Sequence, residues 1–159
     1  MKRRRLLVSA CLCGEPVRYD GRARALDDPR FQRWLEEGRL VPICPEVAGG
    51  LPVPRPEAQR RGSRVVTRDG RDVTTAYERG AAAALALARS CDAALCILKQ
   101  SSPSCGSLQI HDGSFRGKKI PGRGFTAEVL QRAGFRVFGE DQMDEIERAV
   151  AALDTTGDE

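Results

Sequence analysis

The sequence predicts an α/β protein: a single domain with Rossmann-like, three-layer architecture and a mostly parallel sheet. Short apolar runs of strand length alternate with segments of helical periodicity, which is typical of βαβ units. The chain has 159 residues, the size of one ordinary domain, and shows no internal repeat or low-complexity linker. We therefore expect one domain over residues 1–159, with its core at about residues 6–153.

The first half of the chain alternates strands and a helix. Leu6–Ala10 is an apolar run that predicts a buried strand, and Pro29–Glu37 predicts a short helix that ends at Gly38. Leu40–Ile43 predicts a second strand. The following segment, CPEVAGGLPVPRP, is expected to be an irregular loop because its glycines and prolines disfavour regular structure. Arg64–Thr67 predicts an edge strand or one arm of a hairpin.

The second half continues the alternation. Asp72–Ser90 has helical periodicity, with Tyr77, Ala81 and Ala84 among the residues of one stripe, and its small residues suit close packing on a sheet. Ala93–Leu98 predicts a third buried strand. Lys99–Gly124 contains little that indicates a helix, and a loop of that length in a compact domain is usually functional. The remaining elements are a helix, a strand and a final helix, at Thr126–Ala133, Arg136–Phe138 and Asp141–Leu153.

Composition narrows the classes of function. Charged residues make up 30% of the chain and the net charge is +4, which favours an anionic small ligand or RNA only weakly. Aromatic residues are only 5%, so a platform that stacks single-stranded bases lacks its usual side chains. Nucleic acid therefore stays a minor alternative.

The N-terminus, MKRRRLLVSAC, imitates a lipoprotein signal, but its apolar stretch is shorter than the about 7 to 15 residues that a signal needs. No apolar run approaches the roughly 20 residues that span a bilayer. We expect a cytoplasmic protein without a membrane segment. In that reducing compartment, the six cysteines favour metal binding or catalysis over a disulfide framework.

Three cysteines each follow an apolar run of strand length: Cys11 in VSACLCG, Cys44 in VPICPE and Cys105 in SSPSCGS. Because the carboxyl ends of parallel strands form the ligand crevice of such folds, we expect the three thiolates to converge there. His111 is the only histidine, so thiolates must do the ligation, and they select zinc, copper(I) or iron–sulfur clusters. The arrangement predicts a metal or iron–sulfur site with one open coordination position.

Two residues beside these cysteines are candidates for catalysis. If Cys44–Glu46 is extended, Glu46 lies on the same side as the thiolate and is a candidate general base. In Ser102–Cys105, Pro103 takes the second place of a predicted β-turn, which brings the Ser102 hydroxyl close to the metal.

Four ordered motifs, VSACLCGEPVRYDG, CPEVAGGLPVPRP, ILKQSSPSCG and IHDGSF, lie within roughly Leu6–Glu140. Through them the sequence closely resembles the thiouracil desulfidase family. The resemblance implies a [4Fe-4S] cluster bound by three cysteines, with the fourth iron free of protein ligands, and catalytic roles for Glu46 and Ser102. The cysteines at the ligand positions are Cys11, Cys44 and Cys105.

The activity implied by the resemblance is non-redox desulfuration of a thiolated uracil, either 4-thiouracil or 4-thiouridine monophosphate. The products are the oxo base and hydrogen sulfide. An open iron is a Lewis acid and a thiocarbonyl sulfur is a soft donor suited to it. Water activated by Glu46 could then attack the ring carbon, while Ser102 positions the water or relays a proton.

Four further residues are candidates for binding substrate. Arg18, Tyr19 and Asp20 follow the first cysteine, and Arg55 follows the second, so they could line the crevice and contact a base, ribose or phosphate. Surface ion pairing is the alternative explanation for their charges.

Other notable residues are interpreted as structural. Cys91 and Cys96 lie at a helix end and in an apolar strand, where free cysteines act as small hydrophobic residues. Cys13 could approach a metal if Cys11 and Cys13 share one side of an extended segment, but we expect a neighbour of the cluster rather than a ligand. His111 stands where the family motif is more often aromatic and is expected to be structural.

Two rival functions stay open. The first is a zinc-dependent hydrolase or deaminase that uses the same cysteines, and the second is a non-enzymatic iron–sulfur or RNA-binding module. The short chain favours a free base or mononucleotide as partner over intact transfer RNA. We interpret Lys118, Lys119 and Arg123 as solvated charges, although they could also bind the phosphate of a nucleotide. The oligomeric state, monomer or dimer, is left open.

Overall fold

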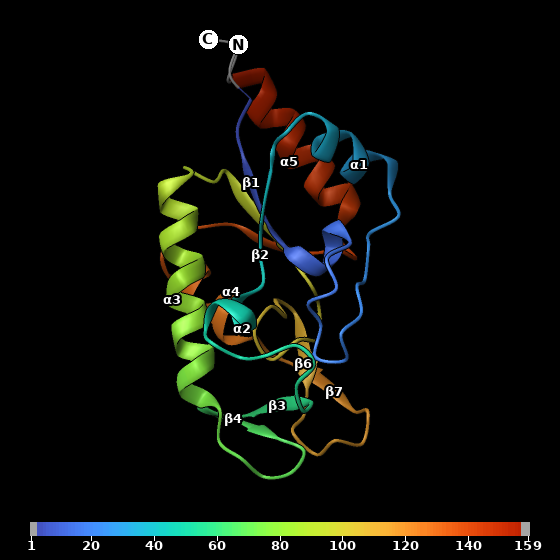
Figure 1. The fold of residues 1–159 in the computed structure, drawn as a ribbon. Coiled ribbons are helices and arrows are strands. Elements are labelled where there is room, and N and C mark those ends of the chain that lie inside the picture. Colours follow the sequence, from blue (N-terminus) through green and yellow to red (C-terminus); the bar gives the residue numbers. More distant parts are fainter. Residues whose placement is uncertain (1–2, 157–159) are drawn as a thin grey trace.

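The computed structural model describes residues 3–156 and has a mixed α/β architecture built on a parallel sheet (Figure 1). The main sheet has the strand order β2-β1-β5-β8, and each of its strand pairs is parallel. The bounds are Leu6–Ser9 for β1, Leu40–Ile43 for β2, Leu95–Leu98 for β5 and Val137–Gly139 for β8. This sheet confirms the expected fold class.

Helices cover both faces of the sheet (Figure 1). α1 (Pro29–Glu36) and α5 (Met143–Thr156) pack on one face, whereas α3 (Thr74–Ser90) and α4 (Phe125–Arg132) pack on the other. The layers are therefore helix, sheet and helix, as predicted. Among residues 3–156, none of the helices has the length and apolarity needed to cross a bilayer.

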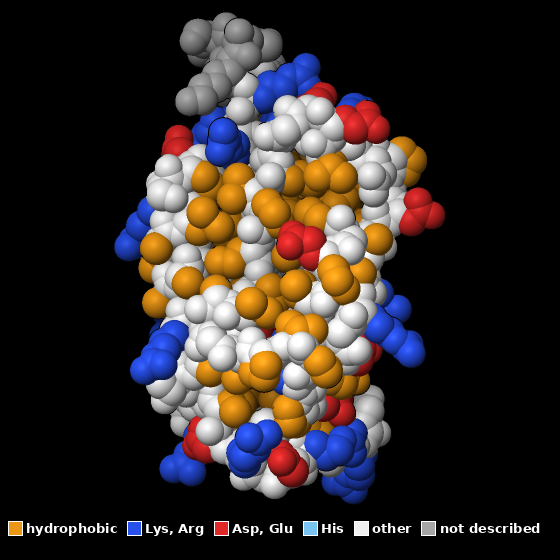
Figure 2. Space-filling view, viewed as in Figure 1, with side chains coloured by type: hydrophobic (Ala, Val, Ile, Leu, Met, Phe, Trp, Pro, Cys, Tyr) orange, Lys and Arg blue, Asp and Glu red, His pale blue; other side chains and the backbone are white. Residues whose placement is uncertain are grey.

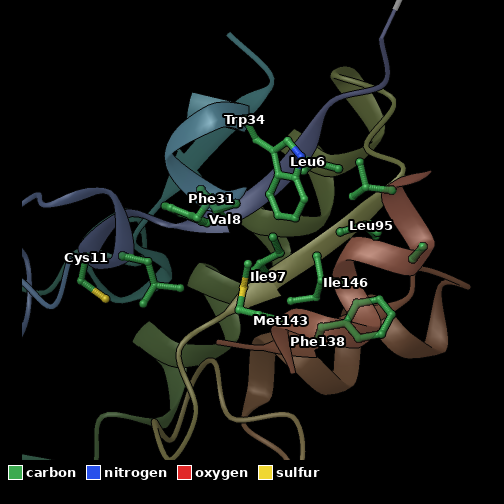
Figure 3. Close-up of a cluster of buried hydrophobic side chains, with 13 residues drawn as sticks. Leu6, Val8, Cys11, Phe31, Trp34, Leu95, Ile97, Phe138, Met143 and Ile146 are labelled. Atoms are coloured by element: carbon green, nitrogen blue, oxygen red, sulfur yellow. The ribbon is translucent and has the colours of Figure 1, made fainter. Parts of the chain in front are cut away.

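The alternation of side chains along the strands divides the hydrophobic core into two clusters. Successive side chains of a strand point to opposite faces. β1 accordingly sends Leu6 and Val8 under α1 and α5, and Leu7 under α3 and α4. In the first cluster Phe31 and Trp34 of α1 are fully buried against the sheet (Figure 3). The sheet is thus packed from both sides and forms a rigid base for its carboxyl edge.

Two antiparallel hairpins lie beyond that edge, toward the lower end of Figure 1. β3 (Ala58–Arg61) pairs with β4 (Arg64–Thr67), which confirms a hairpin arm at the predicted position. β6 (Gln109–His111) pairs with β7 (Lys119–Pro121) inside the segment that was expected to be a long loop. The buried Gln59 joins the hairpins, because its Oε1 accepts hydrogen bonds from the backbone N–H groups of Gly113 and Phe115.

The chain coils immediately after β1, and two predictions fail there. The strand ends at Ser9 rather than Ala10, and Ala10–Cys13 forms a 3₁₀ turn, η1. Gly14, at a φ of 95°, ends the turn and donates to the carbonyls of Ala10 and Cys11. The expectation that Cys11 and Cys13 lie in an extended segment is therefore wrong.

The chain also coils after β2. Pro45–Ala48 forms a short helix, α2, where an irregular loop was expected. Proline suits this first position, because its fixed φ is already helical and it lacks only an N–H that would have no partner there. α2 can pack directly on α3 because Gly49 meets the Ala76 carbonyl and Gly80 meets the Pro45 carbonyl, with no room for a Cβ at either glycine. Beyond Gly49 the segment is irregular as predicted.

Candidate metal centre

The three predicted cysteines lie at the carboxyl edge of the sheet, each in the segment that follows one of three neighbouring strands. Cys11 is in η1 after β1, Cys44 is the residue before α2 at the end of β2, and Cys105 is in the loop after β5. All three line one cavity of about 360 Å³. The structure thus brings together thiols that are far apart in the sequence.

Burial and mutual repulsion keep these thiols protonated when nothing is bound to them. Burial is the main cause that raises the pKa of Cys11 to about 11, and the neighbouring Cys44 adds to it. Burial likewise raises the pKa of Cys44. The pKa of Cys105 is raised above its usual range by burial, with contributions from Glu46 and the other two thiols. Because each thiolate would feel the others, binding of a metal group here would release protons.

The donor set also limits what could be bound. Within residues 3–156, no three side chains of His, Cys, Asp or Glu gather closely enough to hold a single metal ion. A tetrahedral zinc site with Zn–S bonds of about 2.3 Å requires its sulfurs to lie only about 4 Å apart. Three soft thiols that share one cavity fit the donor set of an iron–sulfur cluster, which protein thiolates ligate.

Glu46 lies in the first turn of α2 and faces the same cavity. Its Oε2 accepts a hydrogen bond of 2.6 Å from the Tyr77 hydroxyl and one of 3.2 Å from Arg55 Nε. Its Oε1 has no hydrogen-bond partner among the described residues. The prediction of an extended Cys44–Glu46 segment is wrong, because α2 begins at Pro45, but the helical turn still brings the carboxylate into the cavity beside the thiols.

Ser102 lines the cavity at the start of the turn that carries Cys105. Its Oγ accepts hydrogen bonds from the backbone N–H groups of Ser104, at 3.0 Å, and Cys105, at 3.1 Å. The Gly106 N–H closes the turn on the Ser102 carbonyl at 3.0 Å, so the turn is one residue longer than the predicted β-turn. Both acceptor lone pairs of this hydroxyl are thus used, and its O–H donates to no acceptor among residues 3–156, so it can still donate to a bound molecule.

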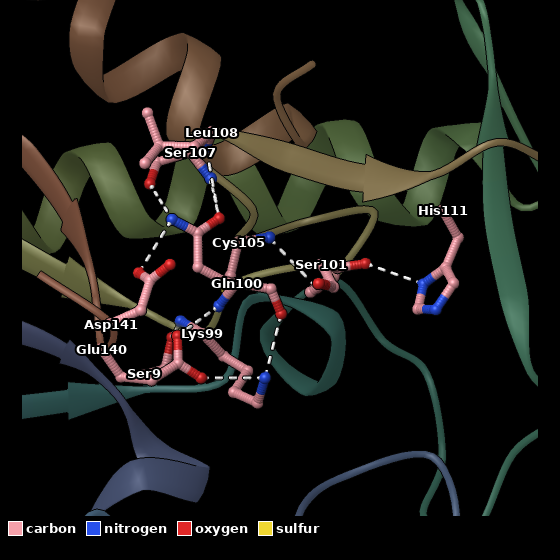
Figure 4. A network of polar contacts seen from close by, with 11 residues as sticks. Ser9, Lys99, Gln100, Ser101, Cys105, Ser107, Leu108, His111, Glu140 and Asp141 are labelled. Atoms are coloured by element: carbon pink, nitrogen blue, oxygen red, sulfur yellow. Dashed lines mark hydrogen bonds and ion pairs between the residues drawn. The ribbon is translucent and has the colours of Figure 1, made fainter. Parts of the chain in front are cut away.

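A glutamine holds the Cys105 loop against the end of the sheet (Figure 4). The buried Gln100 donates from Nε2 to Ser107 Oγ at 3.0 Å and to Asp141 Oδ1 at 3.3 Å. Its Oε1 accepts from the N–H groups of Ser107 and Leu108. The amide thereby ties both ends of the loop to the residues after β8.

The structure brings three of the four predicted substrate-binding residues to the cavity. Arg18, Tyr19 and Arg55 line the cavity. Asp20 does not: it accepts a hydrogen bond from the Arg22 N–H at 3.0 Å and borders a separate, open hollow. Arg55 is buried and bonded to protein groups, unlike Arg18.

Several residues outside the predicted site also line the cavity. Tyr77 was expected only as part of the core face of its helix. Lys99 pairs with Glu140 at 2.8 Å at the edge of the cavity (Figure 4). His111 Nδ1 lies 3.0 Å from the Ser101 carbonyl, which can only accept, so Nδ1 carries the proton and Nε2 is left as an acceptor. His111 therefore has the expected structural contact and also lines the cavity.

Three cations at the cavity have no carboxylate partner within residues 3–156. They are Arg18, Arg24 and Lys119. Figure 2 shows Lys and Arg side chains, with some Asp and Glu, at the lower end of the molecule, where Figure 1 places the two hairpins. An anionic group bound at the mouth of the cavity would provide these cations with a partner.

The other three cysteines lie away from the cavity lining. Cys96 is fully buried in the second core cluster, and Cys91 packs against that cluster, which confirms their role in core packing. Cys13 packs against the first cluster, and burial raises its pKa to about 11.

Fold and site define an α/β protein with three cysteine thiols gathered on one cavity at the carboxyl edge of its sheet. The chain belongs to the 2-thiouracil desulfurase family, whose model matches residues 6–142. It is similar to a solved structure described as the [4Fe-4S]-dependent thiouracil desulfidase TudS (DUF523Vcz). The identity is 45%, the match covers 95% of this chain and 100% of the other, and the TM-score is 0.93. It is also 41% identical over 151 residues to the uncharacterized protein YbbK of Bacillus subtilis strain 168, covering 89% of this chain and 99% of that protein.

Proposed function

We propose that this protein removes sulfur from a thiolated uracil with the help of a [4Fe-4S] cluster. Cys11, Cys44 and Cys105 would hold the cluster and leave one iron without a protein ligand. The observation that carries this proposal is the convergence of three thiols, a carboxylate oxygen and a hydroxyl on one cavity. Family membership and the similarity to a [4Fe-4S]-dependent desulfidase support it.

When bound, the cluster would supply an exposed iron as a Lewis acid for the soft sulfur of a thiocarbonyl. The residues of the chain would do the proton chemistry. Glu46 lines the cavity, and its Oε1 would take a proton from the water that attacks the ring carbon. Ser102 would donate its free O–H to the developing charge on the substrate. The net reaction adds water and releases hydrogen sulfide, with no change in oxidation state.

We propose a mononucleotide, 4-thiouridine monophosphate, as the preferred substrate over free 4-thiouracil. The three cations without carboxylate partners would bind the phosphate while the base enters the cavity. Arg18→Gln tests this directly. The KM for the nucleotide should rise by about tenfold or more, because a hydrogen bond to a charged group is lost, whereas the KM for the free base should stay unchanged. Equal effects on both substrates would contradict a phosphate site.

The function itself is tested by an ultraviolet–visible spectrum of anaerobically purified protein, followed by addition of 4-thiouracil and then 4-thiouridine monophosphate. We expect broad iron–sulfur absorption, loss of the thiocarbonyl band and release of sulfide. Iron and zinc analysis separates the cluster from the zinc alternative. A colourless protein that stays inert after anaerobic reconstitution with iron and sulfide would refute the proposal, and binding of RNA with a steep salt dependence would favour the non-enzymatic alternative.

A further inference from the structure

We propose that Tyr77 and Arg55 are positioning residues that hold the Glu46 carboxylate by one oxygen and so direct its other oxygen at the reacting water. The inference rests on the proposed function and extends it to two residues outside the predicted catalytic set. It also assigns Arg55 a role different from contact with substrate.

Both donors reach the same atom. The Tyr77 hydroxyl lies 2.6 Å from Glu46 Oε2, and Arg55 Nε lies 3.2 Å from it. Oε1 has no partner among residues 3–156, although the side chain is only 15% exposed. A carboxylate fixed by two donors on one oxygen cannot rotate freely, so its second oxygen keeps one direction. Under the proposal that direction is the cavity, which Glu46 lines together with the three thiols.

Tyr77 is itself held rigidly. It lies on the buried face of α3 and is only 2% exposed. Its ring packs edge-on against Phe125 of α4, with centroids 6.4 Å apart and planes at 73°. The neighbouring α2 is fixed on the same helix by the close contact at Gly80. The hydroxyl and the carboxylate therefore belong to one packed unit, and their contact does not depend on a mobile loop.

Arg55 is held by the two loops that it connects. Its Nη1 donates to the Pro52 carbonyl at 3.2 Å and its Nη2 donates to the Val17 carbonyl at 3.0 Å. Each guanidinium nitrogen thus has a protein acceptor, and only 4% of the side chain is exposed. A planar guanidinium fixed in this way suits an orienting role better than recognition of a substrate that must enter and leave.

The test compares kinetic constants of the cluster-loaded wild type with those of Tyr77→Phe and Arg55→Lys. Each variant should lower kcat by about tenfold, a part of the roughly 10² to 10⁴ that a general base supplies, and leave KM unchanged. The matched control is Thr67→Val, which removes another buried hydroxyl that donates to a carboxylate, here that of Asp69, in β4 and outside the cavity lining. It should leave kcat unchanged. Iron content must stay equal in all proteins.

A double-mutant cycle separates positioning from general structural damage. In a Glu46→Gln background, which has no base to orient, Tyr77→Phe should cause no further loss of kcat. Equal losses in both backgrounds, or an unchanged kcat in Tyr77→Phe alone, would overturn the inference. A raised KM with unchanged kcat in Arg55→Lys would instead identify Arg55 as a substrate contact and overturn its part.

A second readout does not require activity. The chain has two tyrosines, so biosynthetic 3-fluorotyrosine yields two fluorine signals, from Tyr19 and Tyr77. Glu46→Gln should shift the Tyr77 signal and leave the Tyr19 signal as a reference. A Tyr77 signal that does not move would overturn the contact even if the wild type were inactive on every thiolated uracil. Failure of the proposed function would appear only in the wild-type sulfide assay, so the two failures are distinguishable.

Discussion

At the scale of single residues, the site depends on which polar atoms already have hydrogen-bond partners in the protein and which do not. Ser102 uses both lone pairs on backbone N–H groups and keeps its proton available. Glu46 uses one oxygen and keeps the other. These hydrogen bonds leave each group one direction in which it can bind a molecule or exchange a proton. An active site is preorganised in this way before substrate arrives.

Replacement of a proposed ligand should remove the cluster, and replacement of its sequence neighbour should not. Cys105→Ala is expected to yield protein without bound iron, because the two remaining thiols cannot hold the cluster. Cys13→Ala should retain the full iron content, since Cys13 packs on the core and does not line the cavity. Iron per chain and visible absorption measure both outcomes. Loss of iron in Cys13→Ala would make that thiol a ligand and change the proposed set.

The sequence predicted the chemical donors of the site better than the residues that orient them. The position of each cysteine at a strand end was enough to expect the convergence, because sheet geometry alone brings strand ends together. Tyr77 was expected only in the core, because its spacing along α3 matches that of Ala81 and Ala84. That the phenol would reach Glu46, 31 positions earlier, depends on packing that no local pattern reports.

At the scale of elements, two short coils determine how the thiols enter the cavity. η1 and α2 each begin within two residues of a strand end, where an extended segment or an irregular loop was expected. The error has a common physical cause: the alternation of a strand persists only while the ladder of hydrogen bonds continues. Once the chain leaves the sheet, a helical turn satisfies its backbone groups locally.

The close contact between α2 and α3 should reverse the usual effect on stability of replacing a helical glycine with alanine. In an exposed helix, Gly→Ala stabilises by about 1 kcal/mol. At Gly80 the added Cβ would run into the Pro45 carbonyl, so Gly80→Ala should destabilise by about 1 to 3 kcal/mol and lower activity by displacing α2. Denaturant unfolding measures the sign. Ala82→Gly, at an exposed position of the same helix, is the control and should cost about 1 kcal/mol without loss of activity.

The N-terminal cap of α1 predicts a specific dependence of stability on pH. Asp28 accepts from the Arg30 N–H and pairs with its guanidinium at 2.8 Å, and the side-chain hydrogen bond from Arg30 is the main cause that lowers the pKa of Asp28. Because the folded pKa lies below the ordinary 3.8, this contribution is present above pH 3.8 and is lost as pH falls through the folded value.

Asp28→Asn keeps an oxygen for the cap and removes only the charge. The free energy of unfolding of the variant should be lower than that of the wild type by about 0.5 to 1 kcal/mol at pH 7, the range of a partly exposed pair. The difference should shrink as the pH falls below 3.8. Denaturant titrations at pH 7 and below pH 3.8 measure it. A difference that stays constant with pH would show that the charge contributes nothing.

At the scale of the whole molecule, the thiol centre touches both core clusters but forms only a small part of them. Cys11 belongs to the first cluster and Cys105 to the second, whereas most members of the clusters are apolar side chains packed between the faces of the sheet and the helices. The fold therefore does not depend on the cluster in the way that a small zinc domain depends on its metal. A bound cluster would still connect three neighbouring strands, β2, β1 and β5.

Loading of iron and sulfide should accordingly raise the melting temperature of a protein that is already folded. We expect a cooperative transition in the apoprotein and a transition several degrees higher after anaerobic reconstitution, since any group that binds only the native state stabilises it. Cys105→Ala should melt at the same temperature before and after reconstitution. An apoprotein with no cooperative transition would contradict the independence of the core.

The spacing of the three thiols along the chain also constrains when the centre can be assembled. β5 lies inside the sheet between β1 and β8, and the thiol that follows it is at position 105 of 159. A growing polypeptide therefore lacks the third donor until residue 105 has been made, after β1, β2 and β5. Insertion of the proposed cluster would consequently have to follow synthesis of these three strands.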